Sequence, residues 1–117
     1  MSPLANDIYR QLLRRARSKH PSITYAELAA SLGKKTAAHP RSPKLYAALG
    51  EVSQACRHHG LPCLPAIVWR RFPPRPGNGY YKIAHPRAHT KHAQIAAWER
   101  EHAQVVSEVE RFPPLVS

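Results

Sequence analysis

The stretch from residue 42 to residue 60, SPKLYAALGEVSQACRHHG, has the pattern of a helix and separates the elements predicted before it from those predicted after it. Ser42 is a typical N-cap, and Pro43 fits the first helical position, where no amide hydrogen is needed. Gly60 is a typical terminator. Apolar residues recur between them at helical spacing, namely Leu45, Leu49, Val52 and Cys56. The stretch therefore predicts a helix that begins at Pro43 and ends before Gly60.

Two further helices are predicted before this stretch. The first runs from Asp7, its expected cap, to Lys19 or His20, because Pro21 stops it. The second begins at Thr24, where the sequence TYAE has the spacing of a capping box. Gly33 is expected to end this second helix with a left-handed residue.

The region after Gly60 predicts a β-hairpin and a last helix. The β-branched and aromatic residues of the range 66–71 are typical of a strand, and residues 80–83 are expected to return as its partner. The final helix should span Thr90 to about Glu110. The order helix, helix, helix, hairpin, helix predicts an α+β, winged helix-turn-helix-like fold, with the hairpin as the wing. We expect one domain over residues 1–111 and a tail over residues 112–117.

The charge of the chain indicates its class of partner. The 117 residues contain 18 Lys and Arg against 7 Asp and Glu, a net charge of +11. Such an excess favours nucleic acid, a membrane surface or an acidic protein as partner. No apolar run is long enough to span a bilayer, and no secretory signal is evident, so we expect a cytoplasmic protein with no membrane partner. Two cysteines are too few for a disulfide framework.

Basic residues fall into two groups around the predicted helix and wing. We expect one face to bind the DNA backbone through both groups, with the third helix entering a groove. The candidate nucleic-acid-binding residues are Lys34, Lys35, Arg41, Lys44, Tyr46, Arg70, Arg71, Arg75 and Lys82. No carboxylate pair, base-activated nucleophile or phosphate-binding loop is apparent, so we expect no enzymatic activity and no cofactor.

The segments ITYAELA (23–29), LPC (61–63) and Gly79-Tyr80 resemble the C-terminal domain of alkylguanine-DNA alkyltransferases. That resemblance covers about residues 23–81 and implies a winged-helix DNA-binding fold. Cys63 follows a proline as the nucleophile of that family does, but Leu64 and Pro65 stand where the family has His and Arg. A thiol without a basic partner stays protonated, so the resemblance does not carry the alkyl-transfer activity to this chain.

The chain is also similar to small uncharacterised proteins of prophages and mobile elements. That similarity suggests a phage regulator, or else an anti-CRISPR-like inhibitor of a host nucleic-acid-processing complex that acts through protein contacts.

Two histidine-rich segments contain residue types that bind metal ions. Cys56, His58, His59 and Cys63 have suitable ligand types but poor spacing, so we expect a core Cys56 and exposed histidines instead. The histidines of residues 85–92 have no acidic residue near them in sequence. We therefore expect no metal site.

The last helix carries an apolar stripe of Ile95, Trp98, Val105 and Val109. We expect this stripe either to close the core or to pair with a second copy of the chain in a homodimer.

Overall fold

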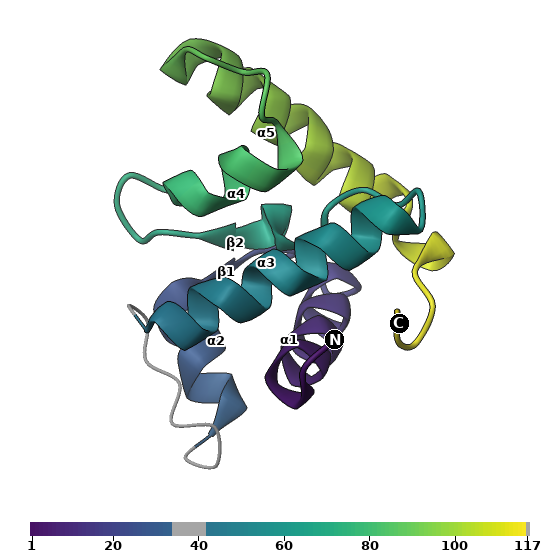
Figure 1. The fold of residues 1–117 in the computed structure, drawn as a ribbon. Coiled ribbons are helices and arrows are strands. Elements are labelled where there is room, and N and C mark those ends of the chain that lie inside the picture. Colours follow the sequence, from purple (N-terminus) through teal and green to yellow (C-terminus); the bar gives the residue numbers. More distant parts are fainter. Residues whose placement is uncertain (34–41, 117) are drawn as a thin grey trace.

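Helices make up most of the chain, with one short parallel sheet beside them, so the fold is α+β (Figure 1). The computed structural model describes residues 1–33 and 42–116. The helices within these ranges are α1 (Pro3–Ala16), α2 (Tyr25–Leu32), α3 (Pro43–His58), α4 (Asn78–Ala84) and α5 (Lys91–Ser107), with 3-10 turns η2 (Leu64–Ile67) and η3 (Val109–Arg111). The strands are β1 (Ile23–Thr24) and β2 (Val68–Trp69).

Helices α2 and α3 begin where their capping signals predicted. The Thr24 hydroxyl accepts the Glu27 amide at 3.1 Å, and the Glu27 carboxylate accepts the Thr24 amide at 3.0 Å. Ser42 caps α3 through the Lys44 amide at 3.2 Å, with a proline in the first turn. The predicted starts of both helices are confirmed, because each depends on contacts between residues two or three positions apart.

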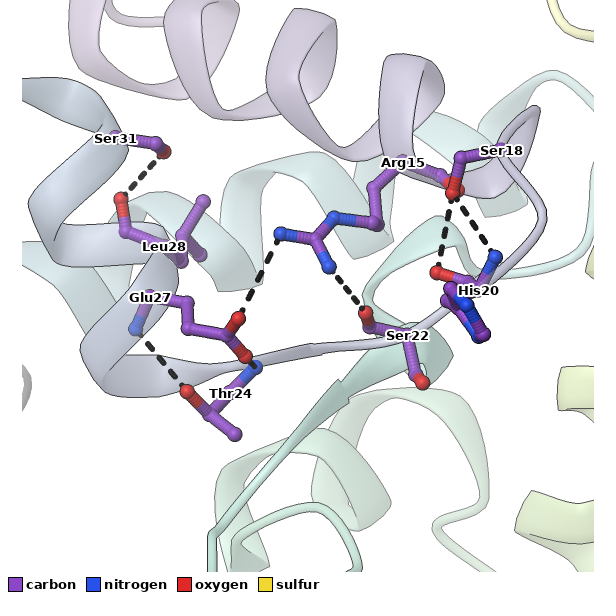
Figure 2. Close-up of polar contacts among 8 residues, drawn as sticks. All are labelled: Arg15, Ser18, His20, Ser22, Thr24, Glu27, Leu28 and Ser31. Carbon is purple, nitrogen blue, oxygen red and sulfur yellow. Dashed lines mark hydrogen bonds and ion pairs between the residues drawn. The ribbon is translucent and has the colours of Figure 1, made fainter.

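Helix α1 differs from its prediction at both ends. It begins at Pro3 rather than after Asp7, because the Ser2 hydroxyl accepts the Ala5 amide at 3.2 Å and a proline occupies the first position. It ends at Ala16, three residues earlier than expected. Arg15 in its last turn donates to the Ser22 carbonyl at 3.2 Å and lies 3.8 Å from the Glu27 carboxylate (Figure 2). Arg15 thereby ties the end of α1 to β1 and to the start of α2.

The core lies between α1, α3 and η2. All four residues of η2 are buried, and the fully buried side chains of α1 and α3 include Ile8, Leu12, Leu45 and Val52. Helix α5 covers η2 from the other side, where the Trp98 indole donates to the Ala66 carbonyl at 2.8 Å. Trp98 and Val105 of the predicted stripe are buried within the chain, so this stripe closes the core.

The predicted β-hairpin wing is wrong. Strand β2 pairs in parallel with β1, Ile23 opposite Val68 and Thr24 opposite Trp69, and the range 80–83 lies in helix α4. A four-residue run of aromatic and β-branched residues does not distinguish a strand from a short helix. As a helix, this run buries both Tyr80 and Tyr81, whereas successive residues of a strand face opposite sides.

Residues after α5 pack onto the body of the protein. Helix α5 begins at Lys91, close to the predicted start at Thr90, and the Thr90 hydroxyl caps it. It ends at Ser107 rather than near Glu110 and is followed by η3. Phe112 and Val116 are 2% exposed, and the Tyr9 hydroxyl donates to the Pro113 carbonyl at 2.5 Å. Within the described ranges, no helix has the length and apolar character needed to cross a membrane.

Candidate nucleic-acid interface

Residues 70–77 connect β2 to α4 and form a loop that projects at the left of Figure 1; we call it the arginine loop. Its backbone is closed by two hydrogen bonds. The Arg70 amide donates to the Arg75 carbonyl at 2.9 Å, and the Arg75 amide donates to the Pro73 carbonyl at 2.8 Å. The peptide bond between Phe72 and Pro73 is cis. Because Arg70 and Arg75 make the two backbone hydrogen bonds, the loop holds the backbones of both arginines in one arrangement.

The end of the arginine loop is anchored to the start of α2. Pro76 is fully buried, and the Gly77 amide donates to the Tyr25 hydroxyl at 2.9 Å. Burial raises the pKa of Tyr25, while this amide acts in the opposite direction. The ring of Tyr25 makes an edge contact with Tyr46 of α3, with centroids 5.7 Å apart. These contacts bring the arginine loop, α2 and the first turns of α3 together.

A cavity of about 430 Å³ opens beside the arginine loop, between α3, α4 and β2. Its volume lies within the usual range of ligand pockets. Its walls are aromatic and apolar, and they also carry the side chains of Arg70 and Asn78. The two helices approach closely at its wall, where a Cβ at Gly50 of α3 would lie 3.2 Å from the terminal methyl of Ile83 of α4.

The structure brings together some of the predicted binding residues. Tyr46 and Arg70 line the same cavity, and Arg70 and Arg75 are joined through the arginine loop. Lys44 in the first turn of α3 and Lys82 on α4 are exposed but do not line the cavity. Arg71 is an exposed member of the arginine loop. The other three predicted residues, Lys34, Lys35 and Arg41, lie outside the described residues.

The arginines of the loop have no acidic partner in the described part of the chain. Arg70 and Arg71 are exposed and Arg75 is half-buried, and no described carboxylate lies within ion-pair distance of any of them. Hydrogen bonds with the backbone and hydroxyl of Thr24 lower the pKa of Glu27, and the charge of Arg71 adds a smaller effect in the same direction. Glu27 does not form an ion pair with Arg71. The positive charge of the loop is therefore not neutralised within the described residues.

The aromatic residues near the arginine loop have different roles. Trp69 is half-buried, with its ring centroid 5.5 Å from those of Trp98 and His102. Phe72 was not among the predicted site residues, yet 88% of it is exposed. The signal for it in the sequence is its position, directly after two arginines and directly before two prolines.

Sequence reasoning also missed a buried polar cluster around Glu101 of α5. Its carboxylate accepts the Cys63 amide at 3.2 Å and the Tyr80 hydroxyl, and it lies 3.2 Å from His85 Nε2. Tyr80 Oη lies 3.0 Å from the same His85 nitrogen. Since the phenol has one proton and a carboxylate only accepts, His85 Nε2 must carry a hydrogen.

The Glu101 cluster joins three segments of the chain. His85 has no acid near it in sequence, but the fold supplies one from sixteen residues away. Burial, followed by the Glu101 carboxylate, raises the pKa of Tyr80 far above its usual range. Tyr80 therefore stays a neutral donor, and the cluster fixes α4 against α5 and η2.

The two cysteines are in environments that suppress reactivity. Cys56 is buried and His58 and His59 are exposed, as expected, and Cys63 is buried as well. Burial raises the pKa of Cys56 to about 11, and burial together with Glu101 raises that of Cys63 further. A thiol must ionise to act as a nucleophile, so this environment does not activate Cys63. In the described ranges, no three His, Cys, Asp or Glu side chains are grouped so as to hold a metal ion.

Comparisons of the chain with protein-family models, with curated proteins and with solved structures found no match.

Proposed function

We propose that this protein is a non-enzymatic nucleic-acid-binding protein whose ligand is duplex DNA. The observation that carries the proposal is the arginine loop, which presents three guanidinium groups without an acidic partner among the described residues. Guanidinium groups are suited to phosphate because their donors match two oxygens at once.

The geometry supports a backbone-binding role for this loop. Its two internal hydrogen bonds and its anchor at Tyr25 reduce the ordering cost of binding. In this proposal the arginine loop takes the part that was predicted for the wing. The first turns of α3, with Lys44 and Tyr46, contact the same DNA in a helix-turn-helix-like manner.

The test is fluorescence anisotropy with labelled duplexes, titrated across salt. The variant replaces Arg70, Arg71 and Arg75 by Gln, and the matched control replaces three other exposed cations, Arg87, Lys91 and Arg100, by Gln. Both proteins lose three positive charges, so a net-charge effect alone would weaken both equally.

We expect the loop variant to bind more weakly and with a flatter salt dependence. Each lost phosphate contact should reduce the slope of log affinity against log salt by about 0.9, so three contacts predict a change of about 2.7. The control should keep most of the slope. Equal losses in the two variants would show that the arginine loop is not the contact surface.

The same titration distinguishes the alternative function. An inhibitor of a nucleic-acid-processing complex would hold its partner through protein contacts, so its binding to free DNA would be weak and would vanish by physiological salt. That result from the unmodified protein would overturn the proposal in favour of a protein partner.

A further inference from the structure

Phe72 is the most exposed large apolar side chain of the described residues. It is 88% exposed, whereas Tyr46, Val106 and Leu115 range from 37% to 47%. Burial of a phenylalanine side chain stabilises a folded chain, and Phe72 contributes almost none of this stabilisation because its side chain stays in water. Its exposed ring is therefore available for contact with a partner.

Phe72 lies between arginines in the sequence of the arginine loop. Arg70 and Arg71 precede the ring, Arg75 follows it, and the hydrogen bond from the Arg70 amide to the Arg75 carbonyl closes the backbone around it. A partner that contacts the ring therefore meets positive charges close to it along the chain, which favours a partner with negative charge.

Three classes of partner can carry negative charge and contact an apolar ring, namely a protein, a bilayer surface and a nucleic acid. They differ in how many exposed apolar side chains they need. A protein docking surface needs a contiguous apolar patch, and a bilayer surface needs several apolar side chains on one face. The other exposed large apolar residues of the described ranges lie outside the arginine loop and on three different segments: Tyr46 on α3, Val106 on α5 and Leu115 after η3. A single ring is sufficient for nucleic acid, because one apolar side chain can insert between two bases while cations hold the adjacent phosphates.

We propose that Phe72 is the base-stacking residue of this protein, inserting its ring at a base step while the arginines of the loop contact the flanking phosphates. This inference rests on the proposed nucleic-acid-binding function and adds a residue with a defined chemical role. Stacking on a base face is independent of salt, whereas phosphate contact is not. The two contributions can therefore be measured separately.

The experiment compares the unmodified protein with Phe72→Ala and Phe72→Trp, and uses Leu115→Ala as the matched control for loss of an exposed apolar side chain. Because Phe72 makes so few contacts in the folded chain, its removal should leave the thermal midpoint unchanged. Binding is measured by anisotropy across salt, and base unstacking by the fluorescence of 2-aminopurine placed at successive positions of the duplex.

We expect Phe72→Ala to weaken binding by roughly 5- to 150-fold with an unchanged salt slope, and to abolish the rise in 2-aminopurine fluorescence. Phe72→Trp should retain both properties, and Leu115→Ala should behave as the unmodified protein. Affinity within twofold of the unmodified protein for Phe72→Ala, while the arginine variant binds weakly, would overturn the stacking role and leave the proposed function intact.

A membrane role has its own readout. Sedimentation with vesicles of phosphatidylcholine and phosphatidylserine should show no dependence on Phe72. Vesicle binding that is lost in Phe72→Ala, with DNA affinity retained, would overturn the inference. Absence of DNA binding by the unmodified protein would overturn the inference and the proposed function together.

Discussion

Replacement of Glu101 by Ala tests whether the buried polar cluster holds α4 and α5 in place. The carboxylate accepts hydrogen bonds from the Cys63 amide and the Tyr80 hydroxyl, and its side chain is 13% exposed. Cys63 and Tyr80 are themselves 1% and 7% exposed. The substitution therefore leaves two buried donors without their acceptor, and His85 without its acidic neighbour.

The size of the effect follows from these two donors. Hydrogen bonds to a charged group contribute about 1.5–3 kcal/mol each, and partial access of water to the vacated space reduces the loss. We expect the free energy of unfolding to fall by about 3–4 kcal/mol. A chain of this length has a total stability of roughly 6–18 kcal/mol, so the variant should fold but unfold much more easily.

Urea denaturation followed by circular dichroism measures this loss. With a slope of about 2 kcal/mol/M, the midpoint should fall by roughly 1.5–2 M. Glu99→Ala is the matched control, because Glu99 is exposed on the same helix and its replacement removes the same charge. Glu101→Gln should give an intermediate loss, because its amide nitrogen replaces one of the two accepting oxygens. A Glu101→Ala midpoint equal to that of Glu99→Ala would refute a stabilising role for the cluster.

Two further predictions concern ionisable groups. The Thr24 amide lowers the pKa of Glu27, and the Ser2 hydroxyl lowers that of Glu51, from an ordinary value of 4.5. Their contribution to stability is therefore complete above about pH 4.5 and is lost as pH falls through the lowered pKa values. In urea titrations at a series of pH values, the free energy of unfolding of the Glu27→Gln, Glu51→Gln double variant should fall less steeply below pH 4.5 than that of the unmodified protein. An equal fall in the two proteins would contradict the assignment. The buried thiols of Cys56 and Cys63 should react with a disulfide reagent at pH 8 only as fast as the protein opens, and both should react at once in denaturant; immediate reaction of one thiol in the native protein would contradict their burial.

Local signals in the sequence were sufficient to place several helix boundaries. The caps at Thr24 and Ser42 lie where predicted, because a cap hydroxyl bonds an amide only two or three residues away. The last helix also begins next to Thr90, its predicted start. Ser2, which is followed by a proline as Ser42 is, caps α1 in place of the predicted Asp7. The candidate cations of the arginine loop were likewise predicted from their clustering in the chain, and the surface role assigned to them stays a prediction.

Contacts between distant segments could not be predicted in this way. Residues 80–83 were predicted as a strand, but in the structure they lie in helix α4, which buries Tyr80 and Tyr81 and brings Ile83 close to Gly50 of α3. Strand β2 pairs with β1, with Val68 opposite Ile23, and not with the residues that follow β2 in the chain.

The sequence by itself determined where α2, α3 and α5 start, that the chain is basic, and that Phe72 lies among arginines after residue 69. Only the tertiary structure decided that Phe72 is exposed, and that Glu101 meets His85 and the Cys63 amide. The physical reason is range. Capping and charge clustering act between residues close along the chain, whereas burial, and the pairing of buried polar groups, depend on how segments far apart in sequence pack together.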